Sequence, residues 1–525
     1  GIVGRDWFHG LSKIRIMDKD RKKSNASKHN LLIMKEINTL GALKASGYTY
    51  KTVKDELRDN LILKLQNKEK VFEGIFGFDD TVLPDLERAI LSRHNILLLG
   101  LRGQAKTRIA RLSVNLLDEY IPIIKGSELN EDPLHPITAA SKELVASMGD
   151  ETPIEWLHKS NRFLEKLATP DVSIADLIGD IDPIKAANNR WSYADERSIH
   201  YGLVPRSNRS IFVLNELPDL QARIQVSLLN ILQEGDIQIR GYKMRLPLDI
   251  QFIFTANPED YTNRGNIITP LKDRIDSQIL THYPDQLSVA KQITLQEARI
   301  GKEVVEKVFL SSPAHNILER IAFVARDSEF VDEHSGVSAR LSISGLENLY
   351  SAAYRRMLRG DYDSTLIRVS DFIGVIPSIT GKVELVYEGE QEGPYNVALN
   401  LLGGAIRDEF LKVFPDPEKN IKKAENDPYI AIKAWFAKGN TVEFWYEDSD
   451  DEMFDKLMEV DGLHNIVADK ANNRAEVIIL MEVVLHGLAE LNMITREMLD
   501  DKISFNDSLA DMFDDLLNTD NEDDY

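Results

Sequence analysis

Three runs of apolar residues mark strands in the first half of the chain. They lie at residues 96–99, 211–214 and 250–255. Short runs of this kind are typical of strands that are buried on both faces of a parallel sheet. Between the runs, apolar residues recur at helical spacing, for example within 109–117 and 224–232. The alternation predicts an α/β fold, a parallel sheet with helices on both faces, whose ligands bind at the carboxyl ends of the strands.

The rest of the pattern predicts segments on either side of this core. Helical spacing dominates after residue 285, where the strands are expected to end. Inside the core, a helical piece is expected to begin at Ile154, and a β-hairpin is expected to turn at Gly241. The predicted organisation is a flexible leader at 1–30, an N-terminal helical segment at 31–70, the α/β core at 71–285, a smaller helical domain at 286–380, a mostly helical C-terminal region at 381–510 and an acidic disordered tail at 511–525.

The first strand leads into a loop that resembles a phosphate-binding sequence. Residues 100–107 are Gly-Leu-Arg-Gly-Gln-Ala-Lys-Thr, and a helical pattern follows at once. In G-x-x-x-x-G-K-[ST] loops, backbone N–H groups and the lysine bind phosphates, and the hydroxyl binds Mg²⁺. Lys106 and Thr107 match these two roles, but Ala105 replaces the usual glycine. An alanine suits the loop if its φ is negative, and an ordinary strand-to-helix turn is the alternative interpretation.

A candidate acidic pair follows the strand at 211–214. In phosphate-loop ATPases, the first acidic residue at this position holds the water shell of Mg²⁺ and the second polarises the attacking water. Here the first residue is Asn215, which can hydrogen-bond a coordinated water but has no charge, and the second is Glu216. The pattern therefore predicts a metal contact by Asn215 and a general base at Glu216. A buried strand that runs into a capped helix is the alternative.

Composition limits what else the chain can be. Its 525 residues include no cysteine, which excludes disulfides and thiolate metal sites, and no apolar run approaches the ~18–20 residues of a membrane span. The net charge of −22 is concentrated at 381–525, where 13 Lys and Arg stand against 34 Asp and Glu. This charge argues against nucleic-acid binding by that region, and the histidines match no metal motif. We expect a cytoplasmic protein.

With these elements in this order, the sequence resembles the AAA+ ATPases, and in particular their magnesium-chelatase and MoxR-like branch. Residues 168–182 are similar to the segment before that branch's helix-2 insert, and 198–209 to the run that precedes its acidic strand. The hairpin at 236–246 corresponds to the pre-sensor-1 hairpin. The likeness covers about residues 71–350. It implies ATP and Mg²⁺ as ligands, a helical lid at 286–380, and a hexameric ring with active sites between subunits.

The resemblance also implies a role for each matching position. Asn257, after the third strand, matches sensor 1, which orients the attacking water. Arg274 matches an arginine finger that reaches the neighbouring subunit's nucleotide, and Arg340 matches sensor 2; surface ion pairs are the alternative for both. The implied cofactor-binding residues are Ile75 and Phe76, which flank adenine, and Gly100, Gly103, Gln104, Ala105, Lys106 and Thr107. Thr107 and Asn215 are the implied metal contacts, and Glu216, Asn257, Arg274 and Arg340 are the implied catalytic residues.

Together these features predict an ATP-binding and ATP-hydrolysing AAA+ protein that remodels or activates a partner protein as an oligomeric ring. The departures at Ala105 and Asn215 predict slow hydrolysis. By resemblance, the partner would carry a von Willebrand A-type domain. Two alternatives stay open: a nucleotide-dependent scaffold that does not hydrolyse ATP, and a AAA+ DNA-dependent motor or transcription regulator. No helix-turn-helix signal supports the last of these.

Overall fold

The computed structural model divides the chain into two compact units. The described residues are 37–189, 191, 195–237, 246–258, 265–420, 427–499 and 501–507. The predicted leader at 1–30, the predicted tail at 511–525 and the expected turn at Gly241 lie outside them. Unit 1 comprises the chain up to Glu73, Asp79–Gly100 and Ala105–Thr281, and unit 2 comprises Gly74–Phe78, Leu101–Gln104 and His282–Tyr525.

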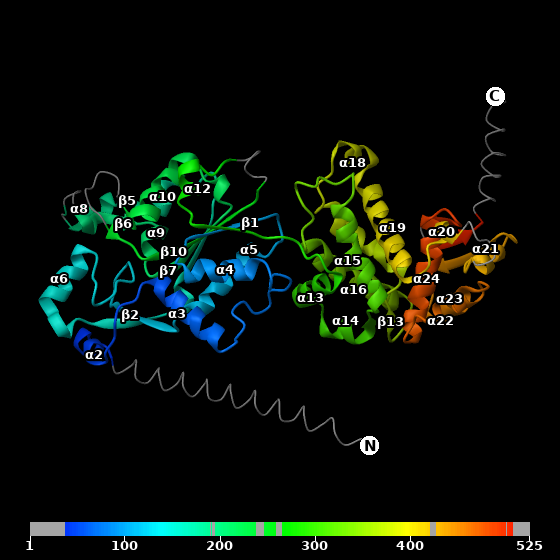
Figure 1. The fold of residues 1–525 in the computed structure, drawn as a ribbon, viewed down its shortest axis with the longest axis horizontal. Coiled ribbons are helices and arrows are strands. Elements are labelled where there is room, and N and C mark those ends of the chain that lie inside the picture. Colours follow the sequence, from blue (N-terminus) through cyan, green and yellow to red (C-terminus); the bar gives the residue numbers. More distant parts are fainter. Residues whose placement is uncertain are drawn as a thin grey trace, which may run out of the picture. The chain divides into compact units, whose positions relative to one another are not determined.

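A parallel sheet forms the centre of unit 1. Among the described residues it has five strands, in the order β11-β1-β10-β7-β4 (Figure 1). They are β1 (Ile96–Leu99), β4 (Phe163–Leu167), β7 (Ser210–Asn215), β10 (Ile250–Ala256) and β11 (Ser277–Leu280). All neighbours pair in parallel, so the carboxyl ends of β1, β10 and β7 lie side by side. The three predicted strands and the predicted α/β class are confirmed.

Helices cover both faces of this sheet (Figure 1). On one face, Leu97, Phe212 and Phe254 of the strands pack with Ile224 and Leu228 of a helix. The helices on the other face include α3 and α5, which contact β10, and α4, which contacts β11. Burial on both faces explains the apolar strand sequences. The described α-helices of unit 1 are α2 (Leu40–Ala45), α3 (Val53–Gln66), α4 (Val82–Leu91), α5 (Lys106–Leu112), α6 (Ala139–Met148), α7 (Ile174–Leu177), α8 (Pro183–Asn189), α9 (Leu203–Arg206), α10 (Ala222–Glu234) and α12 (Thr269–Asp273).

Helix α3 is held in unit 1 by a buried ion pair. Two guanidinium nitrogens of Arg162 donate to Glu56 at 2.7 and 2.6 Å, and both side chains are almost fully buried. Arg162 also donates to the carbonyl of Arg209, just before β7, at 2.9 Å. The Asp249 carboxylate, just before β10, accepts a hydrogen bond from the N–H of Val53 at 2.7 Å. This helix of the predicted N-terminal segment therefore packs as part of unit 1.

Other strands of unit 1 differ from the sequence-based prediction. The helical piece expected at Ile154 is wrong, because Ile154–His158 forms strand β3, which pairs antiparallel with β2 (Tyr120–Ile124). Five residues are too few for periodicity to distinguish a helix from a strand. The pattern also gives no indication of β4. Short antiparallel pairs join β5 (Gly179–Ile181) to β6 (Ile199–Tyr201), and β8 (Asp236–Ile237) to β9 (Leu246–Pro247) at the base of the predicted hairpin.

Unit 2 is mainly helical and has one continuous apolar core, which runs from Val308 to Phe505. Its described α-helices are α13 (Leu287–Glu297), α14 (Lys302–Lys307), α15 (Ser312–Arg326), α16 (Arg340–Arg359), α17 (Ile376–Thr380), α18 (Tyr387–Glu392), α19 (Pro394–Val413), α20 (Pro417–Asn420), α21 (Ile430–Phe436), α22 (Asp450–Met458), α23 (Leu463–Val467) and α24 (Arg474–Glu490). The predicted helical C-terminal region is confirmed. None of the described helices has the length and apolar character needed to cross a membrane.

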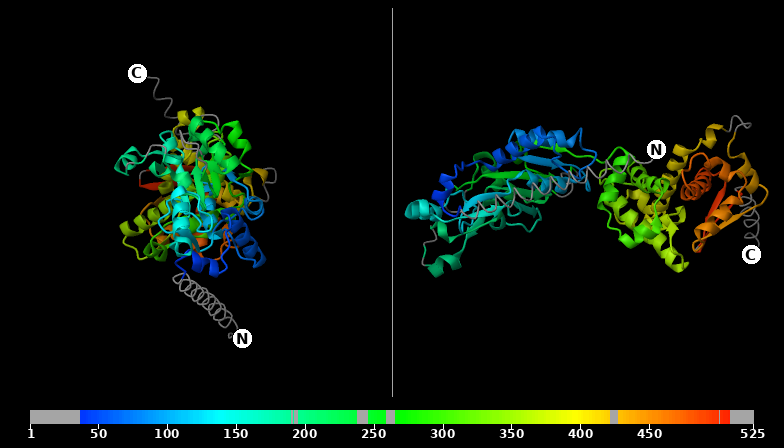
Figure 2. Two further views of the ribbon diagram at one scale, coloured as in Figure 1. Left: turned by 90° about the vertical axis from the view of Figure 1, so that its left-hand side faces the viewer. Right: turned by 90° about the horizontal axis from the view of Figure 1, so that it is seen from below.

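The expectation that strands end at residue 285 is wrong. Strand β12 (Val308–Phe309) pairs with β13 (Thr365–Leu366), and a second sheet has the order β14-β16-β15. Its strands lie beside α24 (Figure 2, orange and red) and are β14 (Val442–Trp445), β15 (Thr495–Met498) and β16 (Lys502–Asn506). Each has at most five residues, which is too short a stretch for alternation to stand out from helical spacing.

Candidate functional site

Lys106 begins helix α5, directly after the loop that follows β1. Its side chain is 8% exposed, and its amine donates a hydrogen bond to the carbonyl of Gly100. Thr107, the next helical residue, is half-buried. Because β1 lies between β10 and β11, this amine is placed at the carboxyl end of an interior strand of the sheet. A buried ammonium group at that end is well placed for a phosphate.

Ala105 has a left-handed backbone, with φ at 56°. The condition under which an alanine suits the loop, a negative φ, is therefore not met. The Cβ of an L-residue in this conformation lies too close to the following carbonyl oxygen, at a cost of ~1–2 kcal/mol. The loop thus adopts a backbone for which glycine is the ordinary residue.

We expect Ala105→Gly to stabilise the protein by ~0.5–1 kcal/mol, because relief of the strain outweighs the extra freedom of glycine in the unfolded chain. The denaturant midpoint of unfolding measures this change. Ala110→Gly is the matched control, since it makes the same substitution inside helix α5 and should be destabilising by ~1 kcal/mol or more. A lower midpoint for Ala105→Gly would show that the strain is absent.

Asn215 and Glu216 follow one another at the end of β7. Asn215 is 8% exposed, and Glu216 is half-buried with a left-handed backbone, φ 54°. The Asn215 amide is bonded at both ends: Nδ2 donates to Glu165 of β4 at 2.7 Å, and Oδ1 accepts from the Thr255 hydroxyl of β10 at 3.1 Å. The N–H of Glu216 donates to the same Thr255 oxygen at 3.2 Å. This network includes Glu165, a residue that sequence reasoning missed because no signal marked its strand.

Asn257 follows β10 at the same end of the sheet. It is 3% exposed, and its Oδ1 has no hydrogen-bond partner among the described residues. A buried polar atom without a partner is costly unless water or a ligand supplies one. Strand β10 lies between β1 and β7, so Asn257 lies between Lys106 and Glu216 in the order of the strand ends. The structure therefore brings these three predicted positions together.

Arg274 ends helix α12, elsewhere in unit 1. Its Nε donates to Gln233 of α10 at 2.9 Å, and its Nη1 donates to the carbonyl of Pro270 at 2.8 Å. The side chain is thereby directed along the surface of its own unit. The guanidinium fork has further N–H groups, which these two bonds do not use.

The other predicted positions belong to unit 2. Gly103 lies against the start of α16, where a Cβ on this residue would be 2.2 Å from Ser338 Oγ, so a side chain is excluded. Gln104 is buried, whereas Arg340, the first residue of α16, is exposed. The loop at Gly103 and the exposed Arg340 therefore both lie at the start of α16.

The predicted adenine-flanking residues lie in the short segment Gly74–Phe78 of the same unit. Gln296 of α13 donates to the carbonyl of Gly74 at 2.9 Å. Ile75 is buried and Phe76 is half-buried. The segment thus offers an apolar surface that α13 holds in place.

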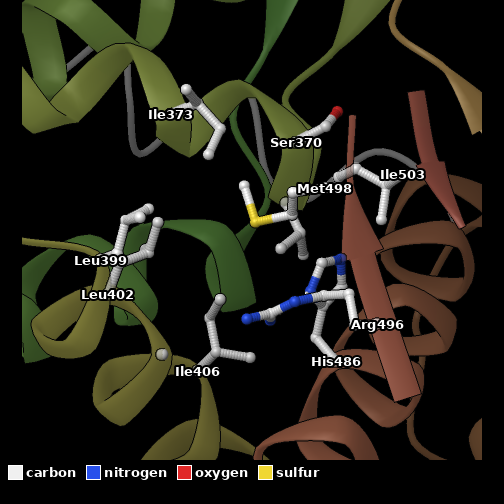
Figure 3. Close-up of a pocket in the computed structure, with 11 residues that line it drawn as sticks. Ser370, Ile373, Leu399, Leu402, Ile406, His486, Arg496, Met498 and Ile503 are labelled. Atoms are coloured by element: carbon white, nitrogen blue, oxygen red, sulfur yellow. Dashed lines mark hydrogen bonds between the residues drawn. The ribbon is translucent and has the colours of Figure 1, made fainter. Parts of the chain in front are cut away.

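A separate pocket in unit 2 has a mainly apolar lining (Figure 3). Its polar groups include Arg496 and His486, whose facing nitrogens are 3.1 Å apart, and Arg496 also pairs with Glu490 at 2.9 Å. Burial, and then the charge of Arg496, hold the pKa of His486 well below its ordinary value, so the imidazole is neutral. Because these polar groups bond to one another, the pocket is a gap in the core of unit 2 and a weaker candidate than the sheet end.

Residues 187–278 match the family model described as Sigma-54 interaction domain. The match contains strand β7, the pair Asn215–Glu216, Asn257 and Arg274. Residues 187–278 are thus similar to a AAA+ domain. Within the matched residues, the order of the strand β7, the pair Asn215–Glu216 and the strand β10 agrees with the order that the sequence predicts.

Relatives of this chain come from two functional groups. The anaerobic nitric oxide reductase transcription regulator NorR from Escherichia coli O7:K1 is 25% identical over 259 residues, which are 45% of this chain and 47% of the relative. The magnesium-chelatase 38 kDa subunit from Cereibacter sphaeroides is 25% identical over 206 residues, 38% of this chain and 54% of the relative. The chain spans about half the length of the curated relatives it matches.

Solved structures align weakly with the whole chain. In a cryo-EM-based complex between subunits BchI and BchD of magnesium chelatase, one chain aligns with a TM-score of 0.31 and 18% identity, covering 61% of this chain and 98% of that one. The α/β class of unit 1 rests instead on the parallel strand order described above.

Proposed function

We propose that this protein binds ATP with Mg²⁺, hydrolyses it, and uses the cycle as an oligomeric ring to remodel or activate a partner protein. One observation carries the proposal: the adjacency of β1, β10 and β7 places Lys106, Asn257 and Glu216 at one end of a parallel sheet. A cation, an amide and a carboxylate in that arrangement are the groups that phosphoryl transfer to water needs.

Each side chain at this sheet end suits one task. Lys106 would neutralise the outer phosphates, and Thr107 would offer its hydroxyl to Mg²⁺. Glu216 would accept a hydrogen bond from the attacking water and polarise it, while Asn257 would hold that water or a phosphate oxygen through its amide. The water oxygen then bonds to the terminal phosphorus, the bond from phosphorus to the bridging oxygen breaks, and ADP and phosphate leave.

The residues present fit an ATP and Mg²⁺ ligand. The buried Oδ1 of Asn257 lacks a partner within the described chain, and the buried amine of Lys106 lies at the same end of the sheet. In the same described residues, no group of three or more acidic or histidine side chains is arranged to hold a metal by itself. This agrees with an ion that is held mainly by phosphates and few protein groups. Bound Mg²⁺ would supply neutralisation of the phosphate charge.

The resemblance gives further nucleotide-binding roles to Ile75, Phe76 and Arg340. Ile75 and Phe76 offer apolar surface for a base, and the backbone N–H groups at Gly103 and Gln104 suit phosphate oxygens. Arg340 is exposed and permanently charged, so it can bind a terminal phosphate as sensor 2.

We expect ATP and Mg²⁺ to drive assembly into a ring, and Arg274→Ala to weaken that assembly, because an arginine finger acts only on a neighbouring subunit's nucleotide. Light scattering of the full chain at micromolar concentration, with and without nucleotide, measures the mass. Arg88→Ala, which removes an exposed arginine paired with Asp85, is the control. A monomer under every nucleotide condition would contradict both the ring and the finger.

The family match favours one alternative function. The model is described as a Sigma-54 interaction domain, and one relative is named a transcription regulator. The alternative is therefore a AAA+ protein that acts on DNA or on the transcription machinery. A gel shift with duplex DNA at low salt tests the DNA-binding form: salt-sensitive binding supports it. A von Willebrand A-type partner stays a prediction from the resemblance to chelatase systems.

A further inference from the structure

Three neighbouring strands contribute one hydrogen-bonded group beside the proposed nucleotide site. It consists of Glu165 on β4, Asn215 on β7 and Thr255 on β10. In the parallel register Glu165 lies opposite Val213, and Leu167 opposite Asn215, so Glu165 and Asn215 point to the same face of the sheet. The contact between their side chains is thus dictated by strand pairing.

The chemistry of the partners fixes the orientation of the Asn215 amide. An ionised carboxylate only accepts hydrogen bonds, so the group that faces Glu165 at 2.7 Å must be the NH₂. The amide oxygen then accepts from the Thr255 hydroxyl, whose oxygen in turn accepts from the N–H of Glu216. Asn215 therefore links the carboxylate of β4 to the backbone of the proposed general base.

Arg111 shows that Glu165 faces the phosphate-loop helix. It lies on α5, one turn after Thr107, and its Nε and Nη2 donate to the two oxygens of Glu165 at 2.9 and 3.2 Å. The side chain of Glu165 is 22% exposed, so it is not closed off from water. The carboxylate is therefore placed between Asn215 and the helix that carries Thr107.

We infer that Glu165 supplies the carboxylate that position 215 lacks, so that the acidic group on the metal side of the site comes from β4, with Asn215 as its positioning amide. This inference rests on the proposed function. In this carboxylate–amide pair, β4 carries the carboxylate and β7 carries the amide. Glu165 acts on the water shell of Mg²⁺, and Thr107 and the phosphates remain the direct contacts.

Position 215 alone indicates that replacing Asn215 with aspartate should improve the site. Because Glu165 already supplies a carboxylate there, we expect the opposite effect. Asn215→Asp would place a second carboxylate 2.7 Å from Glu165 Oε1, in the position now taken by an N–H donor. Two carboxylates at that distance cannot both stay ionised without a cation between them. Asn215→Asp alone should therefore impair the site, whereas Asn215→Asp combined with Glu165→Gln restores one carboxylate and one amide.

The test uses four full-length proteins: wild type, Glu165→Gln, Asn215→Asp and the double variant. Calorimetry with a slowly hydrolysed ATP analogue across a Mg²⁺ titration measures how much Mg²⁺ half-maximal affinity requires, and thermal unfolding without nucleotide reports stability. We expect Glu165→Gln to raise the Mg²⁺ requirement ~10–100-fold, as for outer-shell partners of metals. Asn215→Asp should lower the unfolding temperature at low Mg²⁺, and the double variant should recover both readouts.

Glu155→Gln, on strand β3 outside the five-stranded sheet, is the matched control, because it removes an exposed carboxylate of the same unit and should change neither readout. An unchanged Mg²⁺ requirement in Glu165→Gln would overturn the inference. The inference would also be overturned if the double variant were no better than the worse single variant in Mg²⁺ requirement and unfolding temperature. If wild type fails to bind the analogue at any Mg²⁺ concentration, the proposed function itself falls, and the inference with it.

Discussion

Replacing Lys106 with alanine is expected to abolish measurable nucleotide binding. Its buried ammonium lies at the carboxyl end of β1, and each charge-assisted hydrogen bond lost there weakens affinity by ~10–100-fold. Arg102, the other cation inside the loop, is engaged by Glu384 at 2.7 Å. Calorimetry with a slowly hydrolysed ATP analogue measures the loss.

Lys142→Ala is the control for this experiment, since Lys142 is an exposed lysine of α6 in the same unit. It should bind the analogue as wild type does, and both variants should keep their circular dichroism spectra. An unchanged affinity in Lys106→Ala would mean that the loop is not the site. The roles proposed for Thr107, Asn257 and Glu216 would then fall with it.

Glu216→Gln is expected to reduce ATP turnover by ~10²–10⁴-fold while it leaves ATP binding intact. The substitution keeps the shape of the side chain and removes the charge that polarises the attacking water. The N–H of Glu216 stays bonded to Thr255, so the backbone at the end of β7 need not change. Phosphate release, with Lys106→Ala as the blank, measures turnover, and calorimetry measures binding.

Glu234→Gln is a matched control, because it makes the same change at an exposed position at the end of α10. Wild type and this control should hydrolyse ATP above the blank. If wild type and Glu216→Gln both match the blank and still bind ATP, the protein is a nucleotide-gated scaffold. The Ala105 strain and the uncharged Asn215 are the two features that give this outcome a physical basis.

The parts of the fold that the sequence predicts are those with a strong local signal. Strands β1, β7 and β10 are buried on both faces, so each appears as an apolar run. Strand β4 lies at the edge of the sheet, its first four residues are half-buried, and its sequence, Phe-Leu-Glu-Lys-Leu, mixes apolar and charged residues. Such a strand has no clear period, which is why the sequence does not reveal it.

The sequence by itself determined which residues follow the strands: Lys106 and Thr107 after β1, Asn215 and Glu216 at the end of β7, and Asn257 after β10. These assignments are local, because a motif and the strand before it are continuous in the chain. Only the tertiary structure decided that the carboxylate of Glu165, 50 residues before Asn215, lies beside the Asn215 amide. The lateral order of parallel strands is set by crossover connections and by packing on both faces, and no short stretch of sequence encodes it.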